Sequence, residues 1–181
     1  MVEERPKQRL DPPPDRMDRA GFVARFGGIY EHSPWVAEAV FDAGLPAEAA
    51  DPDVLAGAMA RQVEAAPYAA RLALLRAHPD LAGRLAVAGA LTEASRSEQA
   101  GAGLDRCSEA EFAEFTRLNA AYREKFGFPF ILAVRGHDRH SILAAFRQRV
   151  ESDAETEFRT ALDQVHRIAL MRLRDMAGGA A

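Results

Sequence analysis

Apolar and polar positions along the chain recur mainly with the spacing of helices, and the alternation that marks strands is scarce. Helix start and stop signals recur from about residue 18 onward. The clearest apolar stripe runs along the C-terminal stretch, at Phe158, Ala161, Leu162, Val165, Ile168, Ala169 and Met176. The pattern predicts an all-α fold, a compact single-domain helical bundle of about seven to nine helices.

Capping residues followed by proline indicate where several of these helices begin. Ser33-Pro34 and Asp51-Pro52 both place proline at the first helical position behind a capping side chain. Ser108 has capping-box spacing with Glu111, and the helix that it opens should stop at Gly127. The remaining helices are expected to begin at Pro67, Thr92, Ser141, and Asp153 or Thr156.

One segment, residues 128–135 with sequence FPFILAVR, departs from the helical pattern and resembles a strand. It is an apolar run between the turn residues Gly127 and Gly136. An extended segment without a strand partner must satisfy its backbone N–H groups in another way. One hypothesis is that these donors face a ligand.

The first 16 residues combine charge with Pro12-Pro13-Pro14, so residues 1–16 are expected to form a disordered tail and residues 17–177 the helical domain.

The 181-residue chain is 48% hydrophobic and 28% charged, which is typical of a globular protein. Its formal net charge of −4 does not favour nucleic-acid binding. The sequence shows no secretory leader and no membrane-spanning run, so we expect a cytoplasmic protein. Cys107 is the only cysteine, which excludes an intrachain disulfide and a cysteine-built zinc site.

His78 is the first candidate for chemistry, because it stands directly before Pro79 between two segments that read as helix. The residue before a proline is pushed out of the helical region, so His78 would occupy an N-cap-like position. A simple helix junction is one interpretation. The other is a functional imidazole, since histidine is a poor cap and Asp80 already supplies negative charge.

A second candidate is the trio Ser95, Glu98 and Gln99, whose spacing places them on one face of a helix. Ser95 and Glu98 also have capping-box spacing, so a structural role stays open. Thr92 is the more natural cap, and it would place Glu98 well inside the helix.

Arg172 falls on the apolar stripe of the last helix, four residues after Ile168. Its guanidinium therefore needs a carboxylate or an anionic ligand. A structural ion pair and a substrate contact both satisfy this requirement. Two further histidines, His137 and His140, resemble a metal pair but lie in a polar turn without a clear third ligand, and we predict no metal site.

Four separated segments resemble the OHCU decarboxylase family, where OHCU is 2-oxo-4-hydroxy-4-carboxy-5-ureidoimidazoline. The resemblance covers about residues 17–176. The segments are FGGIYEHSPW at 26–35, LLRAHPDLAG at 74–83, LTEASRSEQAGAGL at 91–104 and YREKFGFPFI at 122–131.

The resemblance implies an all-helical, commonly dimeric carboxy-lyase of purine catabolism that needs neither cofactor nor metal. It would convert a small-molecule ureide into (S)-allantoin after urate oxidation and hydrolysis. The resemblance also implies that His78 and Glu98 are catalytic. The implied substrate-binding residues are Pro79, Ser95, Gln99, Arg172 and main-chain groups of Phe130, Ile131, Leu132 and Val134.

Two other functions stay open from the sequence. One is a helical regulatory module that binds a ureide without turnover. The other is a metal-dependent amidohydrolase that would use His78 with His137 or His140. The decarboxylase interpretation requires His78, Glu98 and Arg172 to converge on one small cavity.

Overall fold

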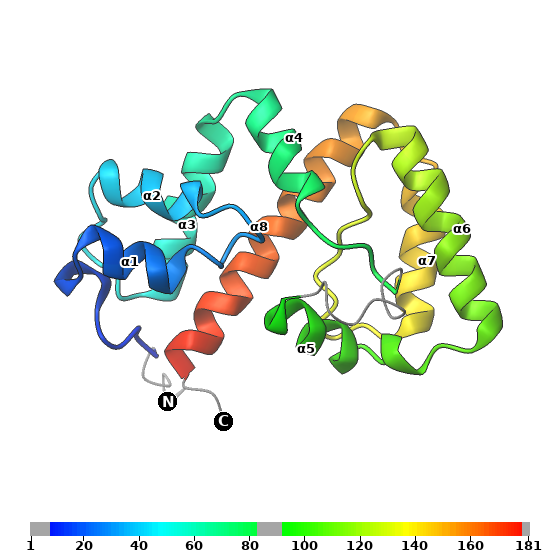
Figure 1. The fold of residues 1–181 in the computed structure, drawn as a ribbon, viewed down its shortest axis with the longest axis horizontal. Helices are drawn as coiled ribbons and strands as arrows, with labels where there is room; N and C mark the ends of the chain where they lie inside the picture. The colour runs from blue at the N-terminus through cyan, green and yellow to red at the C-terminus, as the bar shows by residue number, and fades with distance from the viewer. Residues whose placement is uncertain (1–7, 83–91, 179–181) are drawn as a thin grey trace, which may run out of the picture. The chain divides into compact units, whose positions relative to one another are not determined.

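The computed structural model describes residues 8–82 and 92–178. These residues form eight α-helices and two short 3₁₀ turns without a strand, which confirms the predicted all-α class (Figure 1). The helices are α1 (Arg19–Phe26), α2 (Trp35–Asp42), α3 (Pro52–Ala65), α4 (Tyr68–Arg76), α5 (Glu93–Gly101), α6 (Glu109–Phe126), α7 (Arg139–Arg149) and α8 (Ala154–Gly178). The 3₁₀ turns are η1 (Pro14–Arg16) and η2 (Leu104–Arg106).

Most helix termini follow the local chemistry of the sequence. Asp51 accepts a hydrogen bond from the N–H of Asp53 at the start of α3, and Thr92 caps α5. Ser108 forms the predicted capping box of α6. That helix ends at Gly127, whose φ of 75° lies in the left-handed region that glycine adopts without strain.

The predicted start of α7 was wrong by two residues. The helix begins at Arg139 rather than at Ser141, because Asp138 is the N-cap and Ser141 occupies the third helical position. The two side chains form a reciprocal capping box, in which Asp138 accepts from the N–H of Ser141 and Ser141 accepts from the N–H of Asp138. Ser141 therefore contributes to the cap although it lies within the first turn of the helix.

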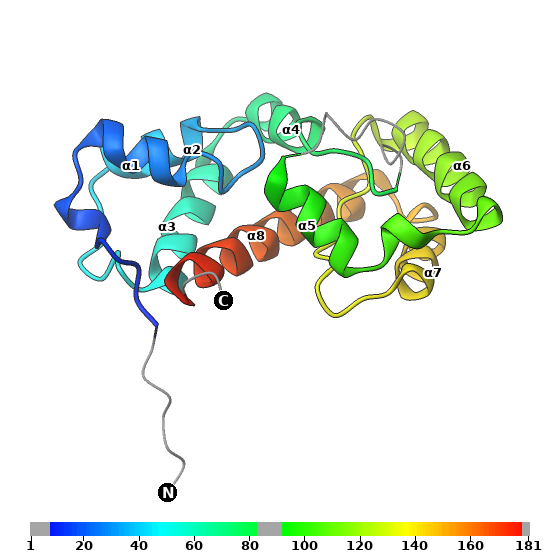
Figure 2. The same cartoon turned by 60° about the horizontal axis from the view of Figure 1, so that its bottom comes forward.

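The chain divides into two compact units, of which unit 1 comprises residues 1–74 and 166–181 and unit 2 comprises residues 75–165. In unit 1, α1 packs on α2 and α2 packs on α3 (Figures 1 and 2). Phe22 is fully buried there, with its ring centroid 4.8 Å from that of Phe26 and 5.5 Å from that of Phe41. Aromatic burial thus joins the first two helices of this unit.

Part of the segment expected to be a disordered tail packs on unit 1. Leu10 is 2% exposed, and its N–H donates to the carbonyl of Ala50 at 2.8 Å. Pro14 is also buried and opens η1. Two residues of the range assigned to the tail, Leu10 and Pro14, are therefore buried in the core of this unit.

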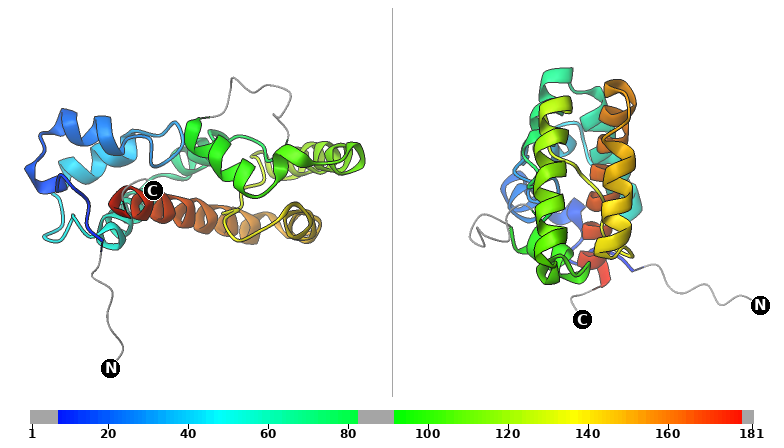
Figure 3. Two further views of the ribbon diagram at one scale, coloured as in Figure 1. Left: turned by 90° about the horizontal axis from the view of Figure 1, so that it is seen from below. Right: turned by 90° about the vertical axis from the view of Figure 1, so that its right-hand side faces the viewer.

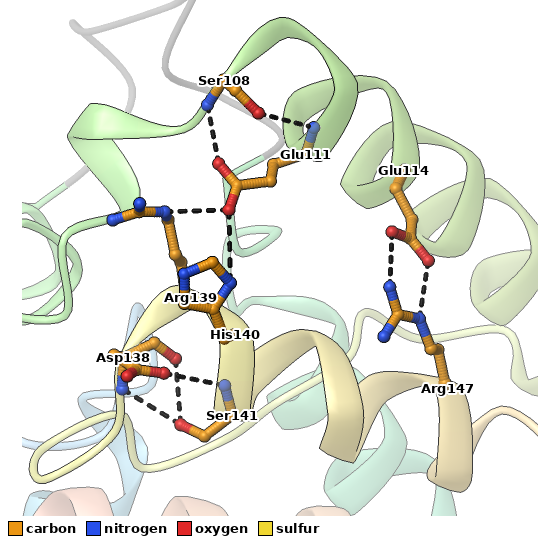
Figure 4. Close-up of polar contacts among 8 residues, drawn as sticks. All are labelled: Ser108, Glu111, Glu114, Asp138, Arg139, His140, Ser141 and Arg147. Carbon is orange, nitrogen blue, oxygen red and sulfur yellow. Dashed lines mark hydrogen bonds and ion pairs between the residues drawn. The ribbon is translucent and has the colours of Figure 1, made fainter.

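Unit 2 is organised around α6 and α7, which lie side by side (Figure 3). Tyr122 of α6 and Phe146 of α7 are fully buried, with ring centroids 5.7 Å apart. On the outside of the same pair, Arg147 of α7 makes a two-pronged ion pair with Glu114 of α6 (Figure 4). The helix pair therefore combines an aromatic interior with charged contacts at its surface.

Residues 128–134, the greater part of the predicted extended segment, connect α6 to α7 and are buried throughout. They are neither helix nor part of a sheet. None of the described helices is long and apolar enough to cross a membrane.

Candidate functional site

His78 lies just beyond the C-terminus of α4 and is 6% exposed. The main-chain N–H of His78 donates to the carbonyl of Leu75 at 3.2 Å, so one more turn-like hydrogen bond follows the end of α4. The helix expected to begin at Pro79 is absent from residues 79–82, which form an irregular stretch and a turn.

The stretch after His78 is held by side chains from two helices of unit 2. The N–H of Ala82 donates to Oε1 of Gln99 on α5 at 3.2 Å, and Nδ2 of Asn119 on α6 donates to the carbonyl of Leu81 at 2.9 Å. Ala82 needs this support because its φ is 54°, a left-handed conformation that is costly for a residue with a side chain. The two amide side chains determine the path of the main chain beside His78.

Asn119 was missed by the sequence analysis, although a signal was present. It is 6% exposed and lies on the buried face of α6, next to Leu118 and between Phe115 and Tyr122. A carboxamide in such a run must have a polar partner. The partner, Leu81, lies 38 residues earlier in the chain, so the sequence did not indicate it.

The polar trio on α5 is placed as the Thr92 interpretation predicted. Thr92 accepts from the N–H of Ser95, so Ser95 is the third residue of the helix and not its cap. The capping-box alternative for Ser95 and Glu98 is thereby wrong. Ser95 and Gln99 are both buried, and Glu98 is half-buried.

The buried segment 130–134 is bonded through its main chain to side chains of two helices. Nη1 of Arg149 on α7 donates to the carbonyl of Ile131 at 2.8 Å. The N–H of Ala133 donates to Oε1 of Gln164 on α8 at 3.0 Å. At least one donor of this segment is therefore bonded to the protein's own side chain and does not face a ligand.

Arg172 belongs to unit 1, whereas the other predicted site residues belong to unit 2. Its Nη1 lies 2.9 Å from Oε2 of Glu31 and 3.3 Å from the carbonyl of Ile29. The Arg172 side chain is 9% exposed and that of Glu31 is 1% exposed. The buried ion pair that the sequence left as one alternative is present.

The two histidines of the polar turn, His137 and His140, make polar contacts with neighbouring side chains. His137 bonds Ser141 at 3.2 Å, and His140 lies 3.4 Å from Glu111 (Figure 4). The backbone N–H of Ser108 and the Arg139 guanidinium hold the pKa of Glu111 at about 2, well below its ordinary value, so this carboxylate is negatively charged at neutral pH.

His166, to which the sequence assigned no role, lies between the hydroxyl of Tyr30 and Oε1 of Glu64, at 2.8 Å from each. Among residues 8–82 and 92–178, no group of three or more His, Cys, Asp or Glu side chains is arranged to hold a metal ion.

Comparisons with known proteins match nearly the whole chain. A model of the OHCU decarboxylase family matches residues 15–174. The 2-oxo-4-hydroxy-4-carboxy-5-ureidoimidazoline decarboxylase of Haloferax volcanii is 48% identical over 161 residues, which are 89% of this chain and 92% of that protein. The protein of the same name from Halalkalicoccus jeotgali is 41% identical, with 90% of this chain and 88% of that protein covered. A crystal structure of (S)-allantoin synthase superimposes with a TM-score of 0.69 at 38% identity, covering 88% of this chain and 51% of that one.

Proposed function

The chain belongs to the OHCU decarboxylase family, and from that premise we propose that it decarboxylates 2-oxo-4-hydroxy-4-carboxy-5-ureidoimidazoline to (S)-allantoin in urate degradation. The observation that carries the proposal is the extent of the relationship. The matched range, residues 15–174, contains every proposed site residue, from His78 to Arg172. The reaction proposed here is stereospecific and uses no cofactor.

Decarboxylation leaves an electron pair on the carbon that carried the carboxylate, and the substrate itself supplies the acceptor. Its adjacent ring C=N takes up this pair and gives an enol-like intermediate, which then collects a proton on one face. The protein's part is to orient the ring, to exclude water and to place one proton-transfer group. These tasks need neither a metal nor an organic cofactor.

His78 is the proposed proton-transfer group. Imidazole titrates near neutral pH, and it would accept the proton of the 4-hydroxyl group as CO2 leaves. It would then return this proton to the adjacent ring carbon, while solvent protonates the ring nitrogen that took up the electron pair. Burial and the bonded main chain at Leu81 and Ala82 support this role, because a catalytic ring must be held in one orientation.

The other proposed residues orient the substrate. The Glu98 carboxylate would accept hydrogen bonds from ring or ureido N–H groups, and Ser95, Gln99 and Pro79 would contact the ligand beside it. Main-chain groups of residues 130–134 would stabilise the charge that develops on the ring. Arg172 would bind a carbonyl or carboxylate oxygen of the substrate while its ion pair with Glu31 orients the guanidinium.

The proposal is tested by adding the protein to freshly generated OHCU and following the circular dichroism of the product. Enzymatic decarboxylation gives a single allantoin enantiomer, whereas spontaneous decay gives both. His78→Asn should lose about 10²–10⁴-fold in rate, the usual contribution of general acid–base catalysis. His137→Asn is the matched control, because it removes a histidine of the turn before α7 that bonds Ser141, and it should leave turnover unchanged.

Each outcome bears on a specific part of the proposal. A fully active His78→Asn protein would remove this imidazole from the mechanism. Glu98→Gln should lose activity and keep its melting temperature, while the reverse result would assign Glu98 a structural role. Calorimetric binding of allantoin by a protein that does not accelerate OHCU decay would support the regulatory module instead.

We also propose a homodimer in the cytoplasm, as the resemblance to this family implies. Light scattering of the purified chain at micromolar concentration tests the first part, and a monomeric mass would contradict it. Fractionation of the source cells tests the second.

A further inference from the structure

We propose that Arg149 is a positioning residue for the main chain of residues 130–134, and that Glu157 and Tyr122 hold it in place. The inference rests on the proposed function, because it takes this segment to be part of the substrate-binding site. All of the residues concerned lie in unit 2.

The Arg149 guanidinium contacts two consecutive residues of the segment. Nη1 donates to the carbonyl of Ile131 at 2.8 Å, and Cζ lies 4.5 Å from the ring centroid of Phe130. The other side of the Phe130 ring is stacked on Phe146, with centroids 3.9 Å apart and planes 11° apart. One cation thus restrains both a ring and a carbonyl, and α7 supplies both the cation and the stacking partner.

The remaining donors of Arg149 are directed at a buried carboxylate. Nε and Nη2 both bond Oε1 of Glu157, at 2.9 Å and 2.5 Å, and the Tyr122 hydroxyl donates to the same oxygen. Glu157 is 1% exposed, and burial raises the pKa of Tyr122, so the tyrosine keeps its proton and donates. Every nitrogen of the guanidinium therefore has a defined partner.

Stability alone does not account for this arrangement. A buried ion pair is often no more stabilising than well-packed apolar side chains of the same volume, because both charges must be desolvated. Arginine contributes a fixed geometry, because two nitrogens of its planar guanidinium bond Glu157 while the third donates to the carbonyl of Ile131. A lysine has the charge but not this geometry.

A second, independent contact restrains the same stretch. Gln164 of α8 accepts from the N–H of Ala133, two residues beyond the carbonyl that Arg149 bonds. The Ile131 carbonyl and the Ala133 N–H are thus bonded to the protein's own side chains. Ligand contacts from this segment are therefore assigned to its other main-chain groups, such as the N–H groups of Leu132 and Val134.

The test compares Arg149→Lys with Arg147→Lys. Arg147 lies on the same helix and also makes a bidentate ion pair, but with the surface residue Glu114 (Figure 4). We expect Arg149→Lys to lower kcat/KM by about 10–100-fold, as a misplacement of about 1 Å does. The enantiomeric excess of the allantoin should also fall, because a loosened main chain holds the ring in more than one orientation. Arg147→Lys should match the wild type in both.

Gln164→Met is the second variant, because it removes only the Ala133 contact and leaves the buried charges paired. It should raise KM and lower the enantiomeric excess even if Arg149→Lys fails to fold. Wild-type KM and enantiomeric excess in every one of these variants that folds, with only a lower melting temperature, would overturn the inference. Failure of the proposed function is a different result, in which the wild-type chain itself does not convert OHCU to one enantiomer.

Discussion

The ion pair between Arg172 and Glu31 allows a quantitative test of how deeply it is buried. Arg172→Met keeps an unbranched apolar stem of similar reach and removes the guanidinium. Glu31, whose side chain is 1% exposed, then loses its cationic partner at 2.9 Å. Water cannot replace that partner without opening the core, so the cost of the buried charge falls on the folded state.

The expected loss is about 3–5 kcal/mol, the range for breaking a buried ion pair from one side. For a domain of this length, each kcal/mol lowers the melting temperature by about 2–4 °C, so Arg172→Met should melt roughly 6–20 °C lower. The penalty should depend on pH. A buried carboxylate without its cation is destabilised in its charged form, so protonation of Glu31 stabilises the variant as the pH falls. The difference in unfolding free energy between Arg172→Met and wild type should therefore be larger at pH 7 than at pH 4.

Urea unfolding at pH 7 and pH 4 measures both effects, and a double-mutant cycle isolates the pair. The double variant Glu31→Gln/Arg172→Met has neither charge. Its loss of unfolding free energy should therefore be smaller than the sum of the losses of the two single variants, by up to about 3 kcal/mol. A loss below about 1 kcal/mol that is equal at both pH values is the behaviour of a solvated surface pair. That result would refute the claim that this pair is buried.

Three further predictions concern unit 2. Because the folded pKa of Glu111, about 2, lies below its ordinary value of 4.5, its contribution to stability is complete above pH 4.5 and is lost as the pH falls towards 2. Glu111→Gln should therefore be less stable than wild type at pH 6 and equal to it near pH 2 in urea titrations, whereas a constant difference would contradict this. Phe146→Ala should lose about 3–5 kcal/mol in a thermal melt, because it leaves a cavity beside the stacked ring of Phe130. Gly127→Ala should lose about 1 kcal/mol because of its positive φ, and Gly127→Asn should lose less in the same assay.

The sequence predicted the helices well because their starts and ends depend on neighbouring residues. Asp51, Thr92 and Ser108 each cap a helix through a bond to a residue two or three positions away. Where two local solutions compete, prediction failed. Asp138 and Ser141 can each cap α7, and Pro79 favours a helix start that residues 79–82 do not adopt.

Sequence patterns did not predict the long-range hydrogen bonds that hold the main chain of the candidate site in place. Asn119 bonds Leu81 across 38 positions, Arg149 bonds Ile131 across 18, and Gln164 bonds Ala133 across 31. Arg149 and Gln164 would be equally compatible with a solvated helix face, and the apolar residues around Asn119 indicated its burial but not its partner. Nothing within one helical turn identifies the partner of any of the three, because the acceptor or donor belongs to another segment.

The sequence by itself determined the helical class and the positions of most caps, and it supplied the residues that we propose to act in catalysis. Only the tertiary structure decided their partners: Arg172 is paired with Glu31, and the Gln99 side chain bonds the main chain beyond His78. The physical reason is that caps and helix periodicity are satisfied within a few residues, whereas burial withdraws a polar group from water and requires a partner from wherever the fold supplies one.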